Sequence, residues 1–322
     1  MVVAGPAPSD APPPPRSPVH PFTRSPVHPF TLGYVYVAIA AALWGLLGPV
    51  TRIALREGVG AVEVAFWRGL LAAGIFAVHA IAIRRVRIDR RDLPSVVAFG
   101  VFGVAGLLAC YSRAVEAGGA ALASILLYTA PVWVALLSAL FMGERLTRRT
   151  LLALLVAMGG VAGIAFASGG GAVRLTPAAL GWGLASAFAY ALYYLFGKRY
   201  FDRYPTATLF IYALPVGALA MLPLVDFRPK NQTAWAAIAF VAIVPTYLAY
   251  VFYSAGLRRV QATRAATVAT VEPVVATFAA FLMWNERLSP AGYAFAAVVL
   301  AGVLMMVGGD TSRPAHAEPP HG

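Results

Sequence analysis

Charged residues are scarce in this sequence. Asp, Glu, Lys and Arg make up 12% of its 322 residues, about half of the roughly 25% typical of soluble domains. A chain with so few charges cannot cover its surface with groups that bind water, so we predict that most of this surface meets lipid. The 30 glycines and 24 prolines agree with that prediction, because both residues are commoner in membrane helices than in soluble ones.

Reactive side chains are equally rare. Cys110 is the one cysteine, which excludes an intrachain disulfide and a Cys/His zinc site, and we expect no cofactor. No Gly-rich phosphate-binding loop of the Walker type occurs, so we expect no ATP coupling within this chain. An intramembrane enzyme would need convergent His, Asp, Ser or Cys groups. The apolar runs contain one histidine, His79, and few acids, and we therefore predict that the protein is not an enzyme.

The net charge of +12 raises the question of a nucleic-acid partner. Most basic residues stand in short clusters between apolar runs, such as Arg84–Arg87 and Arg90–Arg91. Membrane insertion places Lys and Arg at such positions. We therefore expect a lipid bilayer and no nucleic acid as partner.

The middle of the chain consists of long apolar runs between two polar ends. Residues 1–31 are proline-rich and contain the duplicated octapeptide Arg16–Thr23 and Arg24–Thr31, and we predict a disordered tail there and at 310–322. Each run is long enough to cross a bilayer as a helix, and none alternates as barrel strands do. We predict ten spans, at 33–54, 62–83, 94–115, 120–142, 150–168, 176–198, 206–225, 233–256, 262–284 and 289–308.

The loops between these spans predict the orientation. If the N-terminus is cytoplasmic, the cytoplasmic segments hold 17 basic residues and the outer segments hold 7. Cytoplasmic loops carry the excess of Lys and Arg in membrane proteins. We therefore predict a multi-pass protein of the cytoplasmic membrane with both termini in the cytoplasm.

The sequence also repeats itself. Tyr111–Thr147 aligns without gaps on Tyr253–Ser289 at a constant shift of 142 residues, and the alignment matches a proline and the later triplet Glu-Arg-Leu. We interpret residues 32–170 and 176–309 as two five-helix repeats. Because five is odd, the second repeat enters the membrane upside down. Inverted repeats supply an inward and an outward gate around a central substrate site, and this symmetry favours transport over a static scaffold.

Three segments resemble a known family. Tyr128–Pro131 followed by Met142–Thr147, Val271–Pro273 followed by Trp284–Ser289, and Glu63–Ala72 are similar to EamA-type carriers of the drug/metabolite transporter superfamily. The resemblance covers roughly residues 33–308. It implies an all-α membrane protein of ten helices in two inverted repeats, with cytoplasmic termini, that exports or takes up metabolites or drugs. It also implies a cavity lined by spans one to four and six to nine, with spans five and ten peripheral. The chain departs from the pattern at Ala130, where the second repeat has Glu272, and at Asn285, where a glycine is expected.

Glu272 and Arg68 stand out as charged residues predicted to lie toward the middle of the membrane, where a charge costs several kcal/mol unless it is paired or hydrated. Pro273 loosens the helix beside Glu272, because proline lacks an N–H. Glu272 is either a proton, cation or substrate-amine site, or one member of a buried pair with an arginine or a tyrosine hydroxyl. Arg68 either binds a substrate carboxylate, pairs with Glu63 or Glu272, or extends to the outer surface.

The remaining candidates are aromatic residues, prolines and two glutamates. Glu144 and Glu286 end their spans, and each is predicted to pair with a neighbouring loop or to contact substrate. Five prolines are predicted to break helices at depth: Pro49, Pro131, Pro215, Pro245 and Pro273. Aromatic side chains either pack or line the cavity, and the candidates for the cavity are Trp44, Tyr111, Tyr128, Tyr190, Tyr247 and Tyr253.

The sequence therefore predicts a secondary transporter, of exporter type, for a small-molecule substrate. Proton coupling through Glu272 is one alternative, and a passive facilitator of the same fold is another. Cargo, direction, coupling ion and oligomeric state do not follow from these residues.

Overall fold

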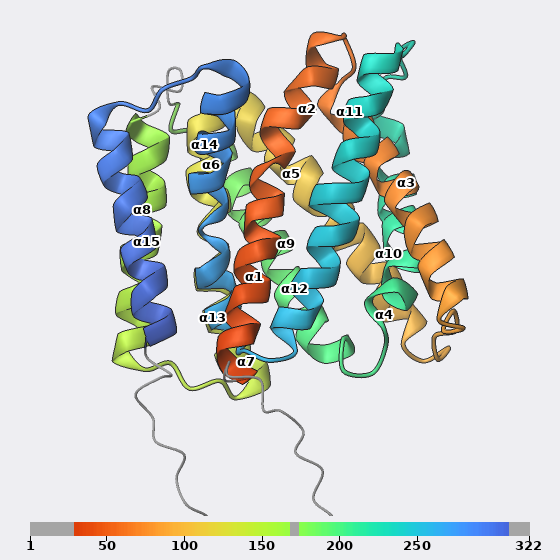
Figure 1. Cartoon of the computed structure of the whole chain (residues 1–322), viewed down its shortest axis with the longest axis horizontal. Coiled ribbons are helices and arrows are strands. Elements are labelled where there is room, and N and C mark those ends of the chain that lie inside the picture. The colour runs from red at the N-terminus through yellow and green to blue at the C-terminus, as the bar shows by residue number, and fades with distance from the viewer. Residues whose placement is uncertain (1–28, 168–173, 309–322) are drawn as a thin grey trace, which may run out of the picture.

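Helices form nearly all of the computed structural model, which describes residues 29–167 and 174–308 and contains no strand in those ranges (Figure 1). The first half holds α1 (Pro29–Gly45), α2 (Leu47–Arg56), α3 (Ala61–Ala82), α4 (Leu93–Ala98), α5 (Gly106–Gly118), α6 (Ala120–Leu127), α7 (Ala130–Met142) and α8 (Arg148–Ala167). The second half holds α9 (Pro177–Tyr200), α10 (Thr206–Met221), α11 (Gln232–Ala242), α12 (Ala249–Leu257), α13 (Ala262–Ala269), α14 (Glu272–Trp284) and α15 (Pro290–Gly308). Short π-helical segments join α4 to α5 (Phe99–Ala105) and α11 to α12 (Ile243–Leu248), and a 3-10 turn (Leu222–Leu224) follows α10.

These helices make ten apolar spans within the described residues, and each span begins and ends within three residues of its predicted bounds. The prediction of ten membrane helices is confirmed. Helix α1 begins at Pro29, so residues 29–31 are helical where a disordered tail was predicted. A proline is tolerated in the first turn because the N–H it lacks would have no partner there. The rest of the predicted tails, residues 1–28 and 310–322, lies outside the described residues.

Spans four and nine are broken at corresponding positions. Helix α6 ends at Leu127 and α13 ends at Ala269, and α7 and α14 begin at Ala130 and Glu272 with a proline in the first turn of each. The bounds of α6 and α7 recur in α13 and α14 at the 142-residue shift. In Figure 1, α6 lies above α7, whereas α14 lies above α13, so the two broken spans run in opposite directions. This correspondence supports the inverted duplication, which stays a prediction.

The other predicted helix breaks differ from one another. The chain breaks at Leu46, three residues before Pro49, and Pro245 lies in a π-helical segment. Pro215 lies inside the continuous helix α10, so the predicted break there is wrong. Lipid supplies no partner for freed backbone groups, and neighbouring helices and local adjustment let a membrane helix continue past a proline.

Helices α8 and α15 form the flank on the left of Figure 1, apart from the centre of the molecule. They approach closely at glycines: a Cβ atom on Gly302 would lie 2.6 Å from the Ala157 nitrogen. Small residues allow this close approach in membranes, where packing replaces the hydrophobic effect between helices. The two peripheral spans are thus the fifth and the tenth.

We expect Gly302→Val to separate α8 from α15, because the added methyl groups would overlap the Ala157 backbone. Overpacking of this kind costs about 1–3 kcal/mol. The matched control is Gly159→Val, since a Cβ at Gly159 meets nothing within 4 Å. Thermal unfolding of the purified protein in detergent measures both. Equal losses of stability in the two variants would contradict the close-packing argument.

Ionic contacts join the two halves at both ends of the bundle. At one end, Arg203 donates to Asp92 at 3.1 Å, and the Tyr204 hydroxyl donates to the other Asp92 oxygen at 2.6 Å. That hydrogen bond raises the pKa of the Tyr204 phenol. At the opposite end, Glu63 is fully buried and pairs with Lys230. The predicted alternative of an Arg68–Glu63 pair is therefore not what the structure shows.

Candidate functional site

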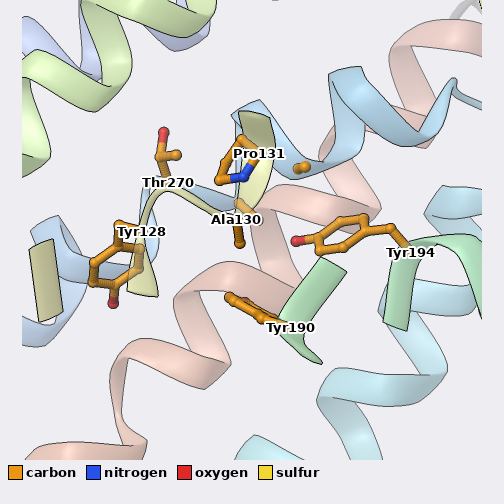
Figure 2. Close-up of a pocket in the computed structure, with 8 residues that line it drawn as sticks. Tyr128, Ala130, Pro131, Tyr190, Tyr194 and Thr270 are labelled. Atoms are coloured by element: carbon orange, nitrogen blue, oxygen red, sulfur yellow. The ribbon is translucent and has the colours of Figure 1, made fainter. Parts of the chain in front are cut away.

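The two helix breaks meet at a small cavity between the halves. Its lining comes from the first break and the start of α7, from α9, and from α13 and the second break: Tyr128, Ala130, Pro131, Tyr190, Tyr194, Ala266, Ala269 and Thr270. Figure 2 shows Tyr190 and Tyr194 on one helix, facing Ala130 and Pro131. The cavity measures about 10 Å³, which is approximately the room for one water molecule. It must widen before it can hold an organic solute.

Glu272 lies beside this cavity in the first turn of α14. The Tyr190 hydroxyl donates to its carboxylate at 3.2 Å, and the Tyr128 hydroxyl interacts with the same carboxylate. No basic side chain of the described residues pairs with Glu272. The carboxylate is therefore held by neutral hydroxyl groups, which can stabilise either its charged form as donors or its protonated form as acceptors.

Aromatic packing extends the site toward α1 and α12. Trp44 and Tyr253 are both buried, with ring centroids 5.3 Å apart. Tyr253 also meets Tyr194 of the cavity at 5.4 Å, edge to face. The Tyr253 hydroxyl is buried and has no hydrogen-bond partner among the described residues. An unpaired buried hydroxyl costs free energy, and this one belongs to a ring that packs directly on the cavity residue Tyr194.

Arg68, on α3, interacts with the same aromatic cluster as Glu272. Its guanidinium interacts electrostatically with the hydroxyls of Tyr193 and Tyr250. The Tyr250 hydroxyl also interacts electrostatically with Glu272, so both charges act on this one group. No acidic side chain of the described residues forms an ion pair with Arg68. Arg68 and Glu272 thus carry opposite charges beside the same tyrosines and form no direct ion pair with each other.

Two predicted aromatic residues lie away from the carboxylate. The Tyr247 hydroxyl contacts the His79 Nδ1 atom at 3.1 Å, and its ring packs on Phe76 at 4.9 Å, so Tyr247 belongs to the interface of α3 with the second π-helical segment. Tyr111 on α5 forms a hydrogen bond with the Ser124 hydroxyl at 3.1 Å and interacts electrostatically with Tyr128. Neither residue contacts Glu272 in this structure.

Several residues at the site were not predicted from the sequence. Tyr194 lines the cavity, and the Tyr250 hydroxyl interacts electrostatically with both Arg68 and Glu272. Neither tyrosine was predicted as a site residue. Tyr194 follows Tyr190 by four residues, and this spacing places both on one helix face, which is a signal that could have identified it. Ala266, Ala269 and Thr270 are small residues with no distinguishing pattern.

A family model matches the chain twice. The model described as the EamA-like transporter family covers residues 31–166 and 177–308. A solved crystal structure is similar with a TM-score of 0.75 at 20% sequence identity, and the match covers 87% of this chain and 99% of that one. At this identity, the likeness supports the fold alone.

Curated relatives match over most of their length. An uncharacterized transporter of Archaeoglobus fulgidus is 30% identical over 81% of this chain and 92% of its own. A probable terminal-alkyne amino-acid exporter of Streptantibioticus cattleyicolor is 28% identical, with coverages of 84% and 91%. A pseudopaline exporter of Pseudomonas aeruginosa is also 28% identical, with coverages of 85% and 93%.

Proposed function

We propose, since this chain belongs to the EamA-like transporter family, that it is a secondary transporter that exports a small organic solute across the cytoplasmic membrane by alternating access. The observation that carries the proposal is the carboxylate of Glu272, held by tyrosine hydroxyls at a cavity where two broken spans meet. Broken helices of this kind form midplane substrate sites in other transporters. Two relatives that are named exporters support the outward direction.

The surroundings of Glu272 support proton coupling as part of this proposal. A carboxylate paired with arginine would stay charged, but hydroxyl partners stabilise both protonation states. Glu272 can therefore take up a proton on one side of the membrane and release it on the other as the cavity changes its opening. A passive facilitator would leave this proton in place during transport. Reconstituted export that continues unchanged after the proton gradient is collapsed would favour the facilitator.

The cargo that best fits the site carries both an ammonium and a carboxylate group. Glu272 can accept from the ammonium, Arg68 can donate to the carboxylate in bidentate fashion, and the tyrosine cluster offers an apolar surface between them. A thermal-shift screen of the purified protein against amino acids, nucleosides, sugars and cationic drugs tests this choice. Stabilisation by zwitterions would support it, and stabilisation by sugars alone would contradict it.

We expect Arg68→Ala to weaken transport of a zwitterionic solute at least tenfold, because a charge-assisted hydrogen bond contributes about 1.5–3 kcal/mol. Transport of the matching amine without a carboxylate should change little. Initial rates in proteoliposomes at several solute concentrations measure both effects. Arg113→Ala is the control, since that side chain is exposed and pairs with Glu116 on its own helix. Equal losses for the two solutes would discard the carboxylate contact.

A further inference from the structure

Two glutamates at corresponding positions have different partners in this structure. Glu144 follows α7, and Glu286 follows α14. Each comes one residue after a left-handed helix end, Gly143 with φ 67° and Asn285 with φ 54°. Each also donates its own N–H to a carbonyl six residues earlier, at 3.2 Å to Ser138 and at 3.4 Å to Ala280. The backbone therefore presents the two carboxylates in the same way, at opposite ends of the bundle (Figure 1).

Glu144 binds the first turn of α13 in the other half. Its carboxylate accepts from the Ala262 N–H at 2.8 Å, from the Thr263 N–H at 3.3 Å and from the Thr263 hydroxyl at 2.9 Å. The first N–H groups of a helix lack partners within the helix and carry partial positive charge. This carboxylate therefore fastens α7 to α13 at the end where the arginine-rich loops lie. Lys198, near the end of span six, interacts with Glu144 electrostatically and makes no direct ion pair with it.

Glu286 binds a cation instead. It pairs with Arg52, near the end of span one, while Arg52 and Arg56 lie over the Trp284 ring at 5.0 and 4.0 Å. The 142-residue shift makes α6 the counterpart of α13 and makes span one the counterpart of span six. The repeat thus assigns each glutamate two candidate partners, a helix N-terminus and a cation. In this structure, Glu144 binds a helix N-terminus and Glu286 binds a cation.

We propose that Glu144 and Glu286 are alternating latches of the transport cycle. Bound to α13, Glu144 closes the cytoplasmic side in this structure, and Glu286 is released onto Arg52. In the opposite state, Glu286 binds the N–H groups at Ala120 and Ala121 of α6 and closes the outer side, while Glu144 moves to Lys198. This inference rests on the proposed alternating access, and it assigns both residues a positioning role apart from cargo binding.

The proposal predicts that Glu144→Gln and Glu286→Gln shift the conformational equilibrium in opposite directions. Glu144→Gln weakens the cap on α13 and so favours the inward-open state. Glu286→Gln weakens the cap on α6 and so favours the state seen here. The Arg52–Glu286 pair is half exposed, with side-chain exposures of 41% and 53%, and such pairs contribute little. In Glu286→Gln, the loss of this pair therefore destabilises the present state less than the loss of the α6 cap destabilises the opposite state.

Access to Ala266 reports the position of the latch. Ala266 lies one turn beyond Ala262, is 2% exposed and lines the cavity. In a Cys110→Ala background, Ala266→Cys can be labelled with a charged, impermeant thiosulfonate applied to the cytoplasmic side of inside-out vesicles. We expect Glu144→Gln to raise the labelling rate about tenfold, as expected for a lost helix cap, and Glu286→Gln to lower it. Glu116→Gln, at an exposed pair within α5, should leave the rate unchanged.

A further variant leaves both glutamates unchanged. Arg52→Gln frees Glu286 to bind α6 and should raise labelling roughly threefold, in the range of an exposed ion pair. Labelling that rises in both Glu144→Gln and Glu286→Gln, or that does not respond to Glu144→Gln, would overturn the latch. The measurement needs no cargo. Opposite shifts in labelling without any measurable transport would therefore leave the latch in place and count against the proposed function alone.

Discussion

Replacing Glu272 by glutamine should abolish solute accumulation driven by a proton gradient while the protein stays inserted and folded. Glutamine keeps the size of the side chain and can still accept from Tyr190, whose hydroxyl lies 3.2 Å from the carboxylate. It cannot gain or lose a proton, so the coupling step has no group to perform it. We therefore expect gradient-driven flux to fall to the level of liposomes without protein.

The measurement is uptake into proteoliposomes with an imposed pH gradient, compared with flux down a solute gradient at uniform pH. If Glu272 serves coupling, the variant loses the first activity and keeps a measurable part of the second. Glu116→Gln is the matched control, since it changes the same chemical group at an exposed position. Unchanged flux together with unchanged pH dependence would reject Glu272 as the coupling residue.

The spans and the family could be predicted from this sequence because each depends on local pattern. Twenty apolar residues in a row need no knowledge of neighbours to be read as a membrane helix. The Glu-Arg-Leu triplets are also local, and the match of the family model to both halves confirms the resemblance. The glycine missing at Asn285 has a simple account, since asparagine is the next best residue for the left-handed helix end found there.

The pairing of charges could not be predicted in the same way. Glu63 pairs with Lys230 across 167 residues, and the nearby Arg68 was the only basic partner that the sequence suggested. Which end of one helix meets which loop of another is decided by packing among ten spans, and hydropathy does not encode it. The same limit explains Tyr250, whose hydroxyl interacts electrostatically with Arg68 of α3 and Glu272 of α14, residues that are far apart in the sequence.

Pro215 shows a different limit. Proline removes one N–H and crowds the preceding turn, and in water this usually ends a helix. Helix α10 continues through it because a lipid environment offers the backbone no other partner than its own helix and its neighbours. Pro131 and Pro273 sit in the first turn of a helix, where the missing N–H costs nothing. Position relative to a helix start therefore decides what a membrane proline does.

Lys230→Ala should destabilise the protein strongly. Glu63 has no exposed side-chain surface and Lys230 has 8%. The lysine ammonium also lies 5.5 Å from the ring centroids of Trp67 and Trp235. Removing the lysine leaves a buried carboxylate without a compensating charge, and such changes cost about 3–5 kcal/mol. Thermal unfolding in detergent should show a large loss, whereas Arg113→Ala, at an exposed pair, should cost at most about 1 kcal/mol.

A double variant separates the charge from the packing. Glu63→Gln with Lys230→Met removes both charges. The Trp67 indole and the Arg228 N–H bind different oxygens of Glu63, at 3.3 and 3.1 Å, so the single amide oxygen of glutamine keeps one of these two hydrogen bonds. Buried ion pairs replaced by neutral groups of similar volume often lose little stability. We therefore expect the double variant to recover most of what Lys230→Ala loses. If the double variant is as unstable as the single one, the lysine acts through its contacts with the two tryptophan rings, and the buried charge is not the cause.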